Sequence, residues 1–237
     1  TYLNVENKEI SDLTGIEDFT ALTFLICRWN QLTSLDVSSH TALTSLWCQG
    51  NQLTTLDVSA NTLLTTLRFD DNALTTLDVS ANTALTSLWC ANNQLTSLDV
   101  SANTALTDLY CNGNQLTSLD VSSNTFLTEL YCDQNQLTYL NMRNGVTDQS
   151  IEFLAMGNDL TCIEVLDSDY ATANWTNDNG NIDEGVTFSE SCVVQGNPDY
   201  TYVPDNNFEQ ALIDLGYDTA LDDFVLTENI SGVTSLD

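Results

Sequence analysis

The chain has 237 residues, of which 34 are acidic and only 4 are Lys or Arg, so its formal net charge is −30 at pH 7. Phosphate backbones and anionic lipid repel this charge, which argues against nucleic acid and bare membrane surfaces as partners. With one His and four basic side chains, few groups remain for acid–base chemistry or for stabilising an oxyanion, so we expect no catalytic residues.

A repeat of 21 residues dominates the sequence from Leu32 onward. Each copy joins the phrase L-T-x-L-D-V-S-x-N to the phrase A-L-T-x-L-x-C-x-x-N-Q. The alternation within L-x-V and L-x-C is typical of half-buried strands, and no copy can bury its Leu side chains without a neighbour. We therefore predict a β-rich solenoid of short coils over residues 1–166. Further copies begin at Leu53, Leu74, Leu95, Leu116 and, stretched by two residues, Leu137.

Two kinds of column are predicted to face the interior when equivalent residues stack from coil to coil. Because Phe69 and Ala155 replace Cys in two coils, we interpret the cysteines as small core hydrophobes and not as metal ligands. Asn columns are expected to satisfy turn N–H and C=O groups, and His40 takes an Asn position in one of them, which argues against catalysis by His40. The cysteine column consists of Cys27, Cys48, Cys90, Cys111 and Cys132.

The phrase L-x-x-L-x-C-x-x-N-x-L resembles the L-x-x-L-x-L-x-x-N-x-L repeat of leucine-rich repeat proteins. The doubled 21-residue form is similar to short repeats in secreted and surface proteins of Bacteroidetes. This resemblance, over residues 3–166, implies a solenoid with a ligand-binding or adhesive role outside the cell, but it names no ligand. The first residues lack the features of a signal peptide, so we expect that any such peptide has been removed. No apolar run approaches the roughly 20 residues of a membrane-spanning helix, so direct membrane insertion is not expected.

An outward stripe on the Cys-bearing strands is aromatic, with one cation. Exposed Trp is unfavourable in water, so an aligned stripe indicates a contact surface for a sugar or a protein partner. Cross-strand aromatic pairing that only stiffens the sheet is the alternative interpretation. The residues of this candidate ligand-binding face are Trp47, Arg68, Trp89, Tyr110 and Tyr131.

An outward column on the other strand is acidic. Like charges about 4.8 Å apart repel by roughly 1 kcal/mol per pair even in water, so this column either stays solvated or recruits divalent cations. Ca²⁺ is the ion that such oxygen ligands would favour, but we predict no metal ligands and no cofactor. Residues 167–185 superficially resemble a calcium loop without matching its motif. The column consists of Asp36, Asp57, Asp78, Asp99 and Asp120.

Cys162 and Cys192 stand outside the cysteine column and bracket the segment after the last coil. In a secreted protein, a disulfide between them is the natural expectation. Closing about 30 residues would stabilise the fold by roughly 3–4 kcal/mol in the chain-entropy model. Residues 167–199 are therefore predicted to form a disulfide-closed end segment and a linker.

Residues 200–237 are predicted to form a small helical cap. The stretch 196–203, bounded by the only two prolines, indicates a linker. A short helix is expected over residues 206–215, ended by Gly216, and a strand follows near residues 224–226. The helical segment resembles the cap that normally precedes such repeats, although it lies last here. Asp218-Thr219-Ala220 resembles an O-glycosylation motif of Bacteroidetes, which makes Thr219 a candidate glycan site.

The chain ends in the phrase that opens a coil and begins with the same phrase in register. We therefore predict that the cap of one unit covers the open first coil of the next, either in covalent tandem or by non-covalent head-to-tail assembly. A cap folded back on its own first coil, or an arbitrary boundary, is the alternative. The predicted assembly residues are Phe208, Leu212, Leu215, Leu236, Leu3 and Val5.

These features indicate a non-enzymatic extracellular repeat module with a structural or adhesive role. In the favoured interpretation its partner is another copy of itself, within a surface array or filament. The alternative is a monomeric module that binds a glycan or a surface protein through the aromatic stripe.

Overall fold

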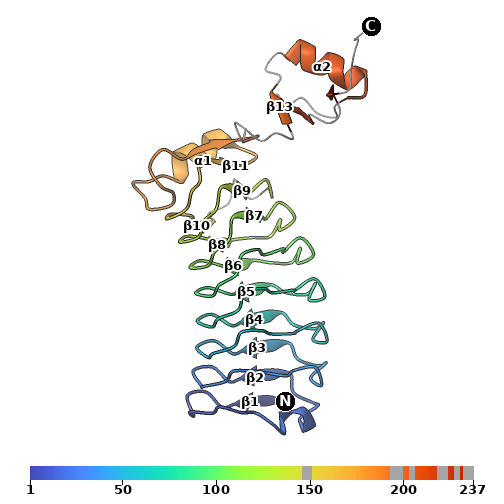
Figure 1. The fold of residues 1–237 in the computed structure, drawn as a ribbon, viewed down its shortest axis with the longest axis vertical. Helices are drawn as coiled ribbons and strands as arrows, with labels where there is room; N and C mark the ends of the chain where they lie inside the picture. The colour runs from blue at the N-terminus through green and yellow to red at the C-terminus, as the bar shows by residue number, and fades with distance from the viewer. Residues whose placement is uncertain (146–150, 193–199, 203–205, 218–223, 227–229, 232–237) are drawn as a thin grey trace. The chain divides into compact units, whose positions relative to one another are not determined.

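A computed structural model describes residues 1–145, 151–192, 200–202, 206–217, 224–226 and 230–231. The chain divides into two compact units, Thr1–Glu190 and Ser191–Asp237. The first unit is a solenoid of stacked parallel coils (Figure 1). It contains the coils and also residues 167–190, which the sequence predicts as a separate end segment.

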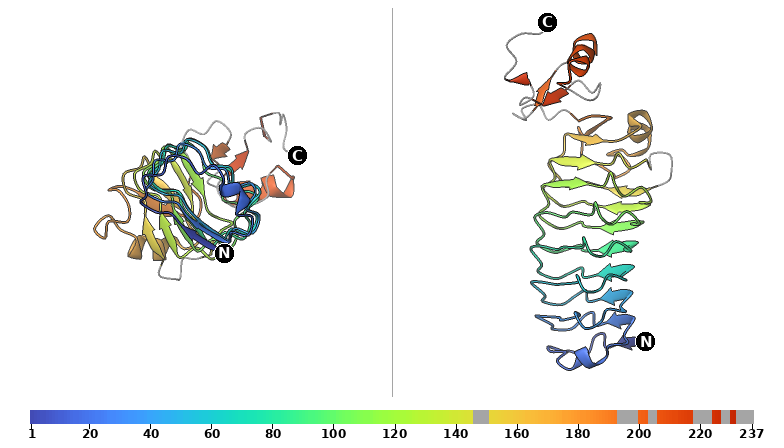
Figure 2. Two further views of the ribbon diagram at one scale, coloured as in Figure 1. Left: turned by 90° about the horizontal axis from the view of Figure 1, so that it is seen from below. Right: turned by 90° about the vertical axis from the view of Figure 1, so that its right-hand side faces the viewer.

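One side of every coil contributes a short strand to an eight-stranded parallel sheet, here called sheet A. The strands pair in register, so that Leu46, Leu67 and Leu88 lie side by side. Figure 2 shows the strands of the sheet stacked one above another. This confirms the strand prediction for the Cys-bearing phrase. In spatial order the strands are β1 (Tyr2–Asn4), β2 (Phe24–Ile26), β3 (Ser45–Trp47), β4 (Thr66–Arg68), β5 (Ser87–Trp89), β6 (Asp108–Tyr110), β8 (Glu129–Tyr131) and β10 (Glu152–Leu154).

A second parallel sheet, sheet B, forms only in the later coils. The prediction that every L-x-V phrase is a strand is therefore wrong for the earlier coils, where residues 34–36, 55–57, 76–78 and 97–99 are not strands. Since the same phrase gives a strand at Ser118–Asp120, the placement of neighbouring coils, and not local sequence, decides the pairing. Sheet B consists of β7 (Ser118–Asp120), β9 (Tyr139–Asn141), β11 (Cys162–Glu164) and β12 (Thr187–Ser189).

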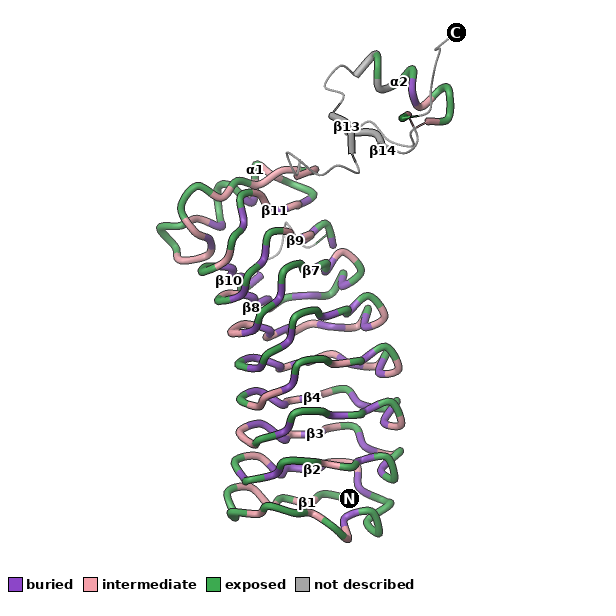
Figure 3. The backbone as a smooth tube through the Cα atoms, in the orientation of Figure 1, coloured by how far each residue is buried: buried purple, intermediate pink, exposed green. Residues whose placement is uncertain are grey.

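The core of the solenoid is a set of apolar columns that alternate with exposed positions (Figure 3). The side chains of Leu46, Leu67 and Leu88 are completely buried, and each such side chain stabilises the fold by about 2 kcal/mol relative to exposure. Phe69 takes the place of Cys in one coil and is equally buried. The predicted cysteine column is confirmed as buried free thiols at Cys27, Cys48, Cys90, Cys111 and Cys132.

Asparagine side chains tie each coil to the one before it. The Asn51 amide donates to the carbonyls of Cys48 at 2.9 Å and Cys27 at 3.1 Å, while its oxygen accepts from the N–H of Leu32 at 3.0 Å. His40 is fully buried, and its Nε2 lies 3.0 Å from the Ile16 carbonyl. The predicted role is confirmed in full for the column of Asn51. In the column that contains His40 the Asn side chains satisfy carbonyls only, as when the Asn61 amide donates to the carbonyls of Val37 and His40. A short 3-10 helix (Ile16–Asp18) lies in the first coils.

The segment after the last coil covers the outer edge of β10. The N–H of Ala155 donates to the carbonyl of Asn181 at 2.7 Å, and the Asn181 amide donates to the carbonyl of Phe153 at 2.7 Å. Trp175, which follows helix α1 (Ser168–Asn174), packs on the ring of Phe153. Asn181, in the stretch that resembles a calcium loop, is therefore used in closing the solenoid.

The predicted disulfide is present, and so is a helix in the segment predicted to be a cap. Cys162 and Cys192 are disulfide-bonded, and helix α2 spans Asn206–Asp214. Gly216 has a φ of 79° just beyond the helix, a left-handed conformation that glycine adopts without strain. The linker prediction for residues 196–203 is wrong in part, because Tyr200–Tyr202 forms β13 and pairs antiparallel with β14 (Phe224–Leu226); aromatic and β-branched residues favour such a strand.

The assembly residues of the second unit differ in exposure. Leu212 is buried against Tyr217 and Ile230, whereas Phe208 and Leu215 are 47% and 46% exposed. The predicted sites Thr219 and Leu236 lie outside the described residues.

Candidate interaction surface

The five predicted ligand-binding residues lie next to one another across sheet A. In-register pairing places Arg68 between Trp47 and Trp89, and Tyr110 between Trp89 and Tyr131. All five side chains are half-buried and belong to the solvent side of their strands, while the intervening Leu residues fill the core. The 21-residue period produces this line because each coil repeats the same outward position.

The side chains of this line contact each other through their flat faces. Trp89 stacks on Tyr110 with ring centroids 4.0 Å apart, and Tyr110 stacks on Tyr131 at 4.5 Å. The Arg68 guanidinium lies 3.7 Å from the centre of the Trp89 ring and 5.3 Å from that of Trp47. Both faces of the Trp89 ring are thus covered by neighbours, and so are both faces of Tyr110. The ring edges are what the line offers to a partner.

Two residues that the sequence analysis missed extend the line. The Arg28 guanidinium lies 4.3 Å from the Trp29 ring and 5.4 Å from the Trp47 ring, and its Nε donates to Glu6 at 2.8 Å. Trp29 is 50% exposed and has a φ of 53°, a left-handed conformation that is unusual for a bulky residue. Its ring lies against Gly50, where a side chain would collide with it.

The line extended in this way is here called the aromatic ladder. A sequence signal for its first rungs existed, since Trp29 stands where another coil has Gly50. The ladder consists of Trp29, Arg28, Trp47, Arg68, Trp89, Tyr110 and Tyr131.

A buried acid accompanies the arginine in the middle of the ladder. Asp70 is 8% exposed, and its Oδ2 lies 3.7 Å from Nη2 of Arg68. Burial raises the pKa of Asp70 to about 6 and also lowers the pKa of Arg68. Gln49, beside Asp70 on the neighbouring coil, is also buried. Desolvation thus opposes both charges, and their mutual attraction only partly offsets it.

The other end of the ladder is acidic. The Tyr131 hydroxyl donates to Glu152 at 2.6 Å, and the Tyr110 hydroxyl donates to Glu129. The hydrogen bond to Glu152 is the main cause that raises the pKa of Tyr131 to about 12. Burial and the bond to Glu129 raise the pKa of Tyr110 above its usual value. Both tyrosines are therefore neutral donors at physiological pH.

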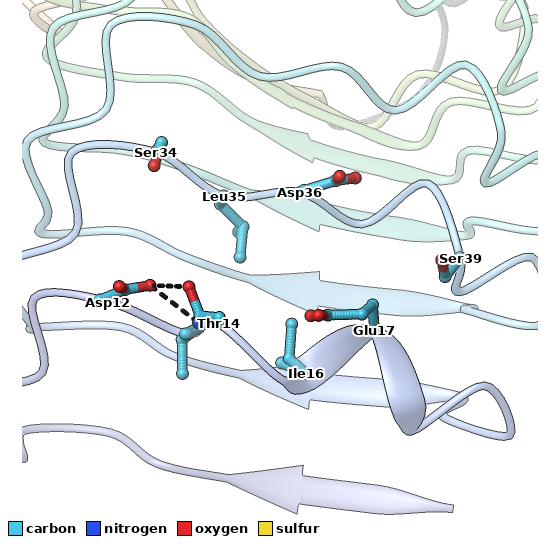
Figure 4. Close-up of a pocket in the computed structure, with 9 residues that line it drawn as sticks. Asp12, Thr14, Ile16, Glu17, Ser34, Leu35, Asp36 and Ser39 are labelled. Atoms are coloured by element: carbon cyan, nitrogen blue, oxygen red, sulfur yellow. Dashed lines mark hydrogen bonds between the residues drawn. The ribbon is translucent and has the colours of Figure 1, made fainter.

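The predicted acidic column lies on the other outward side of the coils. The Oδ1 of Asp36 accepts from the N–H of Ser38 at 2.9 Å, and the serine's hydrogen bonds lower the pKa of Asp36. Asp36 also lines a shallow hollow of about 400 Å³ together with Asp12 and Glu17 (Figure 4). The same bond to the serine two residues on occurs at Asp57, Asp78, Asp99 and Asp120.

Within the described part of the chain, no group of three or more His, Cys, Asp or Glu side chains is arranged to hold a metal ion. None of the described helices has the length and apolar character needed to cross a bilayer.

Parallel in-register coils, filled by Leu and Cys and closed at each corner by Asn, define a leucine-rich repeat solenoid. The fold predicted from the repeat is therefore confirmed.

Comparison with known proteins points to bacterial leucine-rich repeat proteins. The chain is similar to the functional domain of InlJ from Listeria monocytogenes, which includes a cysteine ladder: they are 40% identical with a TM-score of 0.57, over 70% of this chain and 44% of that chain. Internalin C2 from the same species is 21% identical with a TM-score of 0.61, over 79% of this chain and 80% of that chain, and this likeness concerns the fold alone.

A short stretch is also similar to a curated protein. Internalin J of Listeria monocytogenes serotype 4b (strain F2365) is 51% identical over 40 residues, which are 17% of this chain and 4% of that protein. The chain thus spans less than half of the InlJ domain and a small fraction of Internalin J. No protein-family model matches the chain.

Proposed function

We propose that this solenoid is a non-enzymatic, extracellular protein-binding module and that the aromatic ladder is its contact surface. The observation that carries the proposal is the continuous line of half-exposed Trp, Arg and Tyr side chains on one side of sheet A. Trp, Tyr and Arg are the residues that dominate binding energy in protein interfaces. The disulfide between Cys162 and Cys192 supports an oxidising, extracellular location.

The ring stacking favours a protein over a glycan as the partner. A sugar ring stacks on an open aromatic face, but both faces of Trp89 are covered, by Arg68 and by Tyr110. Ring edges and the half-exposed Trp29 remain for contact. These suit the side chains and peptide groups of a protein surface, which meet rigid aromatic anchors without a need for planar stacking.

A site-specific cross-linking experiment tests this function. A photoreactive benzoylphenylalanine is placed at Tyr110 in one variant and at Asp78, on the acidic column, in a matched control. Both variants are irradiated with extracellular proteins, and the cross-linked protein is identified, purified and re-bound. We expect a partner from the Tyr110 position that is absent from the Asp78 position. Equal capture from both positions, or none from Tyr110, contradicts the proposal.

Head-to-tail assembly is a second candidate function, favoured by one observation at the first coil. Leu3 and Val5 are only half-buried, whereas the equivalent residues of the next coil, Leu25 and Cys27, are completely buried. A second copy that covers the first coil through the exposed Leu215 would bury this apolar surface and could assemble into a surface array or filament.

Sedimentation velocity over a range of concentrations tests the assembly. The variant Leu215→Glu should remove larger species, and Leu166→Glu, at a side chain of similar exposure (44%), should keep them. A native protein that stays monomeric at every concentration contradicts the assembly without affecting the binding function.

A further inference from the structure

The two ends of the aromatic ladder differ in whether their carboxylates are paired with a basic side chain, and this difference bears on the partner. Asp108, Glu129 and Glu152 are direct neighbours in register on β6, β8 and β10. The ion pairs near the ladder lie elsewhere, at its first rungs between Arg28 and Glu6 and in its middle between Arg68 and Asp70. In the described part of the chain, no Lys or Arg forms an ion pair with these three carboxylates.

The ladder itself shows how it accommodates a guanidinium. The Arg68 guanidinium lies over the Trp89 ring, with the Trp47 ring on its other side and the carboxylate of Asp70 nearby. Aromatic rings and a carboxylate together are the environment that favours an arginine side chain. At the acidic end Tyr110 and Tyr131 again stand beside carboxylates, but the two rings stack on each other, so a guanidinium there would meet the ring edges and the carboxylates of Glu129 and Glu152. The acidic residues alone would not define a site; the adjoining rings and the example of Arg68 give it its chemistry.

The tyrosines also fix the carboxylates in place. Glu129 accepts from Tyr110 and Glu152 accepts from Tyr131, and the two rings stack at 4.5 Å. Each bond uses one carboxylate oxygen, Oε2, and leaves the other to accept from a partner. The charges are thereby held in a rigid row, which reduces the entropy lost when a partner binds.

We propose that Tyr110, Tyr131, Glu129 and Glu152 bind an arginine-bearing basic segment of the protein partner. This inference rests on the proposed binding function and adds the chemical class of the partner. The net charge of −30 attracts any basic segment over a distance, and the ladder end selects where it docks. Guanidinium is favoured over ammonium because its planar fork of five N–H donors can bond the remaining oxygens of two neighbouring carboxylates at once.

Peptide titration tests the inference, with intrinsic Trp fluorescence or calorimetry as the readout at physiological ionic strength. The probes are three peptides of equal length in which Ser alternates with Arg, with Lys or with Glu. We expect the Arg peptide to bind more tightly than the Lys peptide, and the Glu peptide not to bind. Absence of Arg-peptide binding, or equal affinity for Arg and Lys peptides, overturns the inference.

A matched pair of variants separates the site from the diffuse charge of the chain. Glu129→Gln with Glu152→Gln removes two charges at the ladder end and leaves an oxygen to accept from each tyrosine. Asp99→Asn with Asp120→Asn removes two charges from the acidic column, where Asn141 already makes the equivalent bond to Arg143 N–H. The first pair should weaken the Arg peptide about tenfold, or about 1.4 kcal/mol, and the second less than about twofold. Equal weakening shows diffuse attraction only and overturns the inference.

Failure here is distinguishable from failure of the binding function. If Tyr110 cross-links a partner whose binding is unaffected by Glu129→Gln with Glu152→Gln, the module binds protein but not through a basic segment.

Discussion

The two outward columns of this solenoid come from the same repeat but are stabilised in different ways. On sheet A each side chain contacts the next coil, as when Arg68 lies 3.7 Å over the Trp89 ring and Trp89 stacks 4.0 Å from Tyr110. In the acidic column each carboxylate bonds within its own coil, as when Asp99 accepts from Ser101 N–H at 2.9 Å. One column therefore couples coils, and the other shapes each turn separately.

This difference separates a rigid surface from a solvated one. Side chains that are held by neighbours on both sides lose little entropy when a partner docks, so the ladder is suited to binding. The acidic column stays in water and supplies long-range charge. The carboxylates on the two sides also differ in their titration. Burial raises the pKa of Asp70, which lies beside the ladder, while hydrogen bonds from Ser101 lower the pKa of Asp99 in the acidic column.

The substitution Trp89→Ala should have the largest effect on stability. It removes a half-buried ring that contacts both Arg68 and Tyr110, and we expect the free energy of unfolding to fall by about 3 kcal/mol. Chemical denaturation followed by circular dichroism measures this loss. A loss below about 1 kcal/mol would show that the ladder does not couple the coils.

The burial of Asp70 should make the free energy of unfolding depend on pH. Its pKa of about 6 lies above the unfolded value, so folding favours protonated Asp70, and this stability is lost as pH rises from about 4 to 6. The amide side chain in the variant Asp70→Asn does not titrate, so the variant keeps its stability as the pH rises. The free energy of unfolding of the variant minus that of the native protein should therefore increase by about 2 kcal/mol from pH 4 to pH 7. Free energies of unfolding of both proteins, measured from pH 4 to pH 7, test this prediction. If the gap between the two proteins stays constant over this range, the prediction is wrong. The pKa of Asp99 is lowered, so the stability that Asp99 contributes should change in the opposite direction and be lost as the pH falls.

A double-mutant cycle sharpens the distinction between coupling and local bonding. Trp89→Ala and Tyr110→Ala together should show an interaction energy of about 1 kcal/mol, because the two rings stack. The equivalent cycle on neighbouring aspartates, Asp78→Ala and Asp99→Ala, should be additive within error. Coupling of equal size in both cycles would remove the distinction.

Single changes in the acidic column should have the smallest effect. Asp99→Ala loses one solvent-exposed hydrogen bond to Ser101, and we expect a cost of about 0.5 kcal/mol. Asp99→Asn should cost less, because Asn141 accepts from the N–H of Arg143 in the same way. Thermal unfolding compares the stability of the two variants. A larger loss of stability for Asp99→Asn than for Asp99→Ala would contradict the idea that the hydrogen bond to Ser101 N–H stabilises the turn.

Sequence reasoning went furthest where the repeat decides the outcome. Cys48 and Phe69 occupy the same inward position, and both are completely buried, as their exchange within one column predicts. Sequence reasoning was less successful for positions where one coil has a residue type that the other coils do not repeat. Trp29 is one example, because its contact with Arg28 depends on the space over Gly50. Asp70 is another, since its burial follows from the side chains around it.

The 21-residue period by itself determined the solenoid, its inward Leu, Cys and Asn columns and its outward stripe, because a fixed period places every residue beside its own copies. Only the tertiary structure decided that the rings of the stripe cover one another, that Arg68 fits between Trp47 and Trp89, and that sheet B begins at Ser118. The physical reason is that a repeat fixes which residues are neighbours, whereas their orientation depends on how the side chains and backbones of adjacent coils pack.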